Sequence, residues 1–206
     1  MSHVNEPNRD SNRKSRAMTG GTILPNAHRS KGLMTTEFEP LSALVGRWTV
    51  DPTRGHLGFR VRAMWGLATA NGHFTSYEGA LQVEQTGAVT GALTVQAATL
   101  DTKNKKRDAH LRSADFFDVE QQPTIRFSPT AITPAPDGLT ITGDLQVGAT
   151  ATRLQLPVTV SQLDGRRLRL KTSTSLPRDK VGLVWNRAGM IRGDAHLNAE
   201  IDLVPA

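Results

Sequence analysis

The feature that most constrains the fold of this chain is an alternation of apolar and polar residues that runs through most of the sequence after residue 47. It is cleanest in residues 139–147, where apolar side chains alternate with Thr140, Thr142, Asp144 and Gln146. This period of two is typical of β-strands with one buried face and one solvated face. The same pattern recurs in residues 57–62, 81–84, 93–96, 153–160, 167–171 and 196–203. We therefore expect an all-β fold.

Turn signals separate these strands. They are Thr86-Gly87, residues 136–138, residues 148–150 and Asp164-Gly165. Gly, Pro, Asn and Asp at such points favour tight turns, so neighbouring strands should pair as antiparallel hairpins. About eight strands joined in this way must close into a barrel or fold into two packed sheets, because a long free edge would invite aggregation. The alternation alone leaves both arrangements open.

Two features interrupt the β pattern. Residues 102–113 are rich in Lys, Arg, Asp, Ala and Leu and lack β-branched residues after Thr102, which predicts one short helix or helical turn inserted between strand groups. Pro157 lies on the outward face of its strand and indicates a strand edge or a bulge there, because proline cannot donate a ladder hydrogen bond.

Charge and composition divide the chain into two parts. Residues 1–40 are rich in Asn, Ser, Arg, Gly and Pro and show no period, so we expect a disordered basic tail, followed by a β-domain over residues 41–206. Much of the net charge of +6 comes from that tail, and the remainder is close to neutral. A nucleic-acid surface is therefore not predicted, whereas transient contact of the protein with an anionic membrane stays open.

Several classes of site are not supported by the sequence. The chain has no cysteine, which excludes disulfides and thiolate ligands. The six histidines form no local cluster, and no glycine-rich phosphate loop is present, so we predict neither a metal nor a cofactor. No apolar run is long enough to span a membrane or to act as a secretory signal, and a cytoplasmic location is the expectation.

His110 and Asp108 are the best candidates for chemistry. Histidine is a common general base, and a carboxylate can orient it. Both residues lie in the predicted helical segment, however, where local pairing and capping explain them equally well. We favour structural anchoring, and no catalytic residue is assigned.

Three stretches of the sequence resemble the YceI family. The first contains WTVDP at residues 48–52, HLGFRV at 56–61 and GHF at 72–74. The second is the most specific and reads RDAHLRSADFFDV at 107–119, followed by PTIRF at 123–127. The third runs from Gly143 to Val158, with Arg178, Asp179 and Gly182 beyond it. The resemblance covers residues 46–204. It implies an antiparallel lipocalin-like β-barrel, often dimeric, whose lumen holds a polyisoprenoid or a similar long-chain amphiphile.

The inward-facing residues then become the predicted ligand contacts, because a barrel of this size either fills with side chains or holds one ligand. Each methylene buried contributes roughly 0.8 kcal/mol, whereas association costs an estimated ~4 to 15 kcal/mol, so a long chain suits such a lumen best. The predicted contacts are Leu57, Phe59, Val61, Phe74, Leu81, Val83, Leu93, Val95, Phe117, Phe127, Leu145, Val147, Leu154, Leu156 and Val158.

The predicted head-group residues are Arg107, His110 and Arg112, since arginine binds phosphate well. The leading hypothesis is thus a non-catalytic lipid carrier. The alternatives are an enzyme that acts on a bound lipid through His110 and Asp108, and a packed barrel without ligand that serves as an interaction module in stress.

Overall fold

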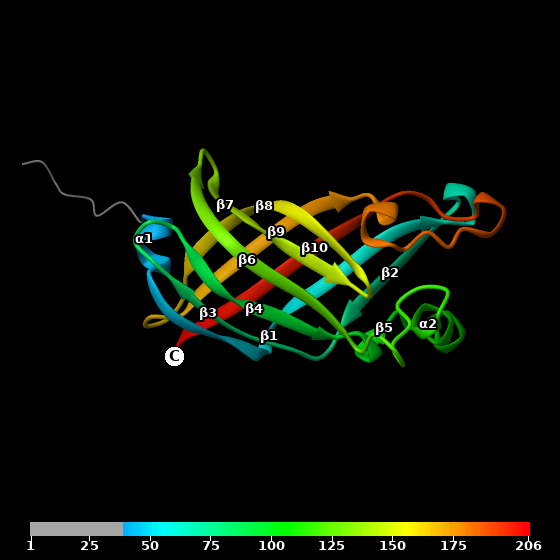
Figure 1. The fold of residues 1–206 in the computed structure, drawn as a ribbon, viewed down its shortest axis with the longest axis horizontal. Helices are drawn as coiled ribbons and strands as arrows, with labels where there is room; N and C mark the ends of the chain where they lie inside the picture. The colour runs from blue at the N-terminus through cyan, green and yellow to red at the C-terminus, as the bar shows by residue number, and fades with distance from the viewer. Residues whose placement is uncertain (1–38) are drawn as a thin grey trace, which may run out of the picture. The chain divides into compact units, whose positions relative to one another are not determined.

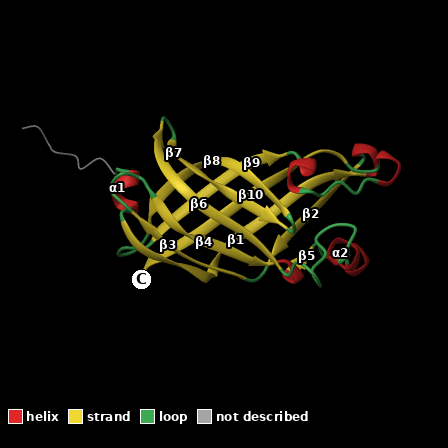
Figure 2. Ribbon diagram, viewed as in Figure 1, coloured by secondary structure: helices red, strands yellow, loops and turns green. Residues whose placement is uncertain are grey.

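The computed structural model describes residues 39–206, which form a closed antiparallel barrel of eight strands (Figures 1 and 2). The barrel prediction is confirmed, and the alternative of two packed sheets is wrong, because the last strand pairs with the first. The predicted tail lies outside the described residues except for its last two positions. The barrel strands are β1 (Gly46–Ala63), β3 (Tyr77–Val83), β4 (Val89–Gln96), β6 (Thr124–Ala135), β7 (Gly138–Val147), β8 (Thr150–Gln162), β9 (Leu168–Leu176) and β10 (Arg192–Pro205).

The predicted turns connect neighbouring strands as antiparallel hairpins. Gly87, between β3 and β4, has a φ of +83°. A Cβ atom there would lie 2.2 Å from the carbonyl oxygen of Ile132, so both the backbone conformation and the space require glycine. The loop between β3 and β4 therefore packs closely against β6.

One end of the barrel, which we call the closed end, is filled by a packed core. The short helix α1 (Pro40–Leu44) covers it, and the indole Nε1 of Trp48 donates a hydrogen bond of 2.7 Å to the carbonyl oxygen of Leu44. Trp48 is only 2% exposed, and Leu139 and Leu203 are also buried in the same cluster. This bond and the apolar contacts around it fix the helix against the barrel.

At the opposite end, the open end, the strands separate. β1 pairs with β3 only over Gly46–Thr49 and pairs with the extra strand β2 (Ala68–Phe74) from Leu57 onward; β2 in turn pairs with β5 (Leu100–Asp101). β8 pairs with β9 only from Thr159. Pro157 lies before that point, in the part of β8 whose edge toward β9 is unpaired. The strand edge predicted at Pro157 is therefore present.

Non-strand segments complete the wall at the open end. They are the helix α2 (Lys105–Arg112) and residues 177–191, which include the short 3-10 turns η3 (Arg178–Val181) and η4 (Arg187–Gly189). Two further 3-10 turns, η1 (Met64–Gly66) and η2 (Ala97–Thr99), follow β1 and β4. The predicted helix is therefore present, and within residues 39–206 no helix has the length and apolar character needed to cross a membrane.

The helix α2 begins three residues later than predicted. Thr102 continues from β5, and Lys103 has a φ of +61°, which is outside the helical region. Asn104 then caps the helix, because its side-chain oxygen accepts a hydrogen bond of 3.1 Å from the backbone N–H of Arg107.

Candidate functional site

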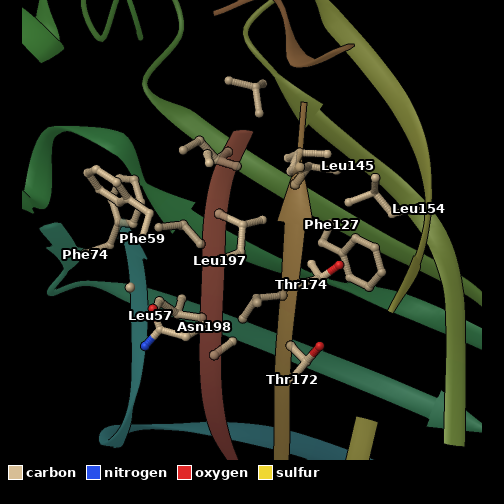
Figure 3. Close-up of a pocket in the computed structure, with 18 of the residues that line it drawn as sticks. Leu57, Phe59, Phe74, Phe127, Leu145, Leu154, Thr172, Thr174, Leu197 and Asn198 are labelled. Carbon is tan, nitrogen blue, oxygen red and sulfur yellow. The ribbon is translucent and has the colours of Figure 1, made fainter. Parts of the chain in front are cut away.

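The barrel encloses an apolar cavity of about 450 Å³ that reaches from the closed-end core to the open end. Its inner part is lined by buried residues of the core, including Leu44, Val89 and Ile132. Its volume lies within the roughly 300 to 1,000 Å³ that small-molecule sites occupy. Figure 3 shows Leu57, Phe59, Phe127, Leu145, Leu154 and Leu197 around this space.

All the residues predicted to contact a ligand line this cavity. They are Leu57, Phe59, Val61, Phe74, Leu81, Val83, Leu93, Val95, Phe117, Phe127, Leu145, Val147, Leu154, Leu156 and Val158. The period of two brings the strand residues together, because every second side chain of a strand in the wall points inward, whereas Phe117 lies in the turn that follows α2. Their contact with a ligand stays a prediction.

The cavity also has lining residues that the alternation did not single out. Thr172 and Thr174 of β9 bring hydroxyl groups to an otherwise apolar wall, and Arg178, Trp185 and Met190 come from residues 177–191. The β9 threonines follow the same period of two as Leu168 and Leu170, so an extended strand pattern could have found them. Residues 177–191 have no such period, and the family resemblance at Arg178, Asp179 and Gly182 did not place this segment at the cavity.

The predicted head-group residues occupy two different environments. Arg107 and His110 line the cavity, whereas Arg112 does not. The Arg112 guanidinium instead donates to the backbone carbonyl of Leu100, which turns it toward the protein. A head-group role for Arg112 is therefore not supported by its position, and the roles of Arg107 and His110 stay predictions.

Three side chains of α2 tie the helix to residues 100–102. The Nε and Nη2 atoms of Arg107 donate to the side-chain and backbone oxygens of Thr102, at 2.8 and 2.7 Å. The buried carboxylate of Asp108 accepts hydrogen bonds from the backbone N–H and the hydroxyl of Thr102, at 2.9 and 2.5 Å. Arg112 adds its bond to Leu100. Structural anchoring thus accounts for most of the motif at residues 107–112.

The pairing of Asp108 with His110 that the catalytic alternative required is not formed. Residues two apart on a helix lie on different faces, so Asp108 turns inward to Thr102 while His110 turns toward the cavity. The Nε2 atom of His110 lies 2.9 Å from the carboxylate of Asp115 instead. That pair is exposed and sits beside aromatic rings, and the hydroxyl of Ser113 donates to the backbone carbonyl of His110 at 2.8 Å.

An aromatic cluster joins the two segments that complete the open end. The His110 ring meets the rings of Phe116 and Trp185 edge-on, with centroids 5.1 and 4.7 Å apart. Arg178 holds the backbone near Trp185, because its Nη1 donates to the carbonyl oxygens of Leu183 and Trp185 at 3.2 and 3.4 Å. The cluster and Arg178 together form the wall of the cavity at its open end.

The basic residues that line the cavity have no acidic counterpart there. Within residues 39–206 they are Arg107, Lys171, Arg178 and the imidazole of His110, and no carboxylate belongs to the lining. Lys171 is paired outside the barrel with Glu200 at 2.8 Å, and the pKa of Glu200 is lowered chiefly by the hydrogen bond from this ammonium group. The other three residues lie at the open end, so an anionic group would be favoured there.

The anchoring of α2 leads to a test of stability. Replacing Asp108 with alanine should lower the free energy of unfolding by about 1 to 3 kcal/mol, because the buried backbone N–H of Thr102 loses its acceptor. Chemical denaturation measures the change. The control is Asp115→Ala, which removes an exposed carboxylate and should have a smaller effect. Equal effects of the two substitutions would show that Asp108 does not anchor the helix.

The sequence matches the YceI-like domain model over residues 48–203. A UPF0312 protein of Photorhabdus laumondii is 29% identical over 132 residues, which cover 62% of this chain and 62% of that relative. Protein YceI of Escherichia coli is 30% identical over 112 residues, which cover 52% of this chain and 58% of the relative. The chain thus spans about three fifths of the length of these relatives.

Two solved structures have a similar fold. One is BcnA of Burkholderia cenocepacia, with a TM-score of 0.66 and 19% identity over 74% of this chain and 98% of that one. The other is described as a polyisoprenoid binding domain from Saccharophagus degradans, with a TM-score of 0.63 and 11% identity over 77% of this chain and 98% of that one. At these identities the likeness concerns the fold.

Proposed function

This chain belongs to the YceI-like family, and from that membership and its cavity we propose that it is a binding protein that carries a polyisoprenoid or a similar long-chain amphiphile. The observation that carries the proposal is the shape and chemistry of the cavity, a mostly apolar space that begins at the closed-end core and is lined by Arg107, His110 and Arg178 at the open end. The structural neighbour described as a polyisoprenoid binding domain supports the same class of ligand.

The arrangement suits a molecule with an apolar tail and a polar head. A tail in the cavity would contact leucine, valine and phenylalanine side chains along its length. Because each buried methylene contributes roughly 0.8 kcal/mol, the binding energy should grow with chain length until the cavity is full. A head group would meet Arg107, His110 and Arg178, where the wall is no longer apolar.

The length of the apolar tail provides the first test. Titrations with geraniol, farnesol and geranylgeraniol, which differ by one isoprene unit, should show an affinity that rises by about a hundredfold or more for each unit. Isothermal titration calorimetry measures the dissociation constants. An affinity that does not change along the series would contradict a tail held in the cavity.

The head group provides the second test. Geranylgeranyl diphosphate should bind more than about tenfold more tightly than geranylgeraniol, since an arginine beside a phosphate forms charge-assisted hydrogen bonds. Replacing Arg107 with glutamine should remove most of that difference while affinity for the alcohol is retained. The matched control is Arg126→Gln, because Arg126 is an exposed residue of β6 that does not line the cavity. Equal affinities of the unaltered chain for the two probes would contradict an anionic head group.

A further inference from the structure

Large apolar side chains gather on the outer surface of the open end. Within residues 39–206, exposed large apolar residues occur at four positions, Met64, Trp65, Leu67 and Val184, and Leu67 and Val184 are 87% and 70% exposed. The first three lie in the turn between β1 and β2, and Val184 lies in the segment that precedes β10. In Figure 1 both segments are at the end of the barrel far from α1 and the C-terminus.

Hydrogen bonds hold these two segments together. The backbone N–H of Trp65 donates to the carbonyl oxygen of Met190 at 3.1 Å, and its indole Nε1 donates to the carbonyl oxygen of Ala188 at 3.0 Å. We call residues 62–68 and 184–192 the open-end patch. The patch adjoins the cavity directly, since Ala63, Trp185, Met190 and Ile191 line it.

The conformation of the turn does not account for its apolar residues. Met64 and Trp65 have φ values of +50° and +57°, in the left-handed region where glycine and asparagine are the favoured residues. Ala188, across the patch, has a φ of +52°. Met64 and Trp65 thus occupy backbone positions where glycine or asparagine would be less strained. Strained positions of this kind cluster at functional sites.

The charge of the patch favours one kind of partner. Arg62, Arg187 and Arg192 are exposed within it, and the patch contains no acidic residue. We propose that the open-end patch docks the protein on an anionic lipid surface, with Trp65, Leu67 and Val184 in the interfacial layer and the arginines at the phosphates. Tryptophan favours this interfacial depth, and arginine side chains extend from it toward the head groups. The cavity would then open toward the bilayer.

A second copy of the chain fits the patch less well. A symmetric dimer through this surface would set two patches face to face that each carry three arginines and no carboxylate, and like charges without a counter-ion oppose association. An anionic membrane instead attracts every arginine, with a gain of about fivefold in binding for each. The inference goes beyond the proposed function, because docking requires no particular ligand in the cavity.

Vesicle binding of the full chain tests the proposal. In a sedimentation assay, the protein should bind vesicles of phosphatidylcholine mixed with phosphatidylglycerol at least about tenfold more tightly than vesicles of phosphatidylcholine alone. The double variant Leu67→Ser and Val184→Ser should lose about tenfold or more of that binding. Arg62→Gln with Arg187→Gln should lose about twentyfold.

A control variant shows whether lost binding comes from the arginines of the patch or only from a lower net charge of the chain. Arg47→Gln with Arg166→Gln removes the same charge at exposed positions near the closed end and should leave vesicle binding almost unchanged. The basic residues before position 39 are identical in every variant, so binding through them would make all variants equal and would overturn the proposal. Loss of binding in the closed-end control to the same extent would overturn it as well.

Two further measurements distinguish docking from the other roles of the protein. Neither Leu67 nor Val184 lines the cavity, so their double variant should still bind geranylgeraniol in solution as the unaltered chain does. If docking fails while this binding persists, only the docking inference is overturned. Light scattering tests whether a second copy of the chain covers the patch instead. If the unaltered chain is a dimer and the double serine variant is a monomer, the patch is a protein interface and the docking proposal is overturned.

Discussion

Replacing Leu145 with tryptophan should weaken the binding of geranylgeraniol by about a thousandfold while the barrel remains folded. Leu145 faces the cavity from β7 and is one of the side chains around the open space in Figure 3. The larger indole would occupy room for about five ligand carbons, and at roughly 0.8 kcal/mol for each methylene the loss is about 4 kcal/mol. Calorimetric titration measures the affinity, and circular dichroism checks that the β-sheet is intact.

The matched control for this substitution is its neighbour in sequence. Gln146 is exposed and points to the opposite face of β7, so Gln146→Trp adds the same bulk outside the cavity and should leave the affinity nearly unchanged. Retained affinity in the Leu145 variant would mean that the ligand binds elsewhere. Equal losses in both variants would mean that the substitutions act through the strand rather than through the cavity.

Replacing Trp48 with alanine should lower the free energy of unfolding by about 3 to 5 kcal/mol, the usual cost of removing a large buried aromatic side chain. Trp48 is 2% exposed and lies in the closed-end core, where its indole also holds the last residue of α1. The closed end must supply much of the stability of the barrel, since the strands separate at the open end. Denaturation with urea measures the effect.

Two further variants define what Trp48 contributes. Trp48→Phe keeps most of the apolar contact but removes the donor to Leu44, so it should cost about 1 to 3 kcal/mol. Trp65→Ala removes an exposed tryptophan from the open end and should change stability by about 1 kcal/mol or less. A loss in the Trp65 variant as large as in the Trp48 variant would contradict a barrel stabilised mainly at its closed end.

The sequence was informative wherever the structure depends on strand periodicity. The side chains of Leu145 and Leu154 face the same cavity because alternation along a strand fixes the side of the wall on which each residue lies. The position of Pro157 likewise indicated the free edge of β8. Closure into a barrel was not predictable from alternation, since it depends on pairing between β1 and β10, which lie at opposite ends of the domain sequence.

The open end was much harder to predict. Arg178 and Trp185 lie in a segment without regular strand structure, and the contact of Trp185 with His110 of α2 and its bond from Arg178 are not encoded by any local pattern. The same limit applies to Asp108, whose partner proved to be Thr102 rather than His110. Local composition predicted a helix there, whereas tertiary contacts decide which side chain faces the cavity.

Native mass spectrometry of the full chain with geranylgeraniol tests most directly whether the barrel encloses a binding space. The unaltered chain should acquire the mass of one probe molecule, the Gln146→Trp variant should do the same, and the Leu145→Trp variant should remain at the mass of the polypeptide alone. Failure of the unaltered chain to take up the probe, or equal uptake by the Leu145→Trp variant, would contradict a ligand held within the cavity.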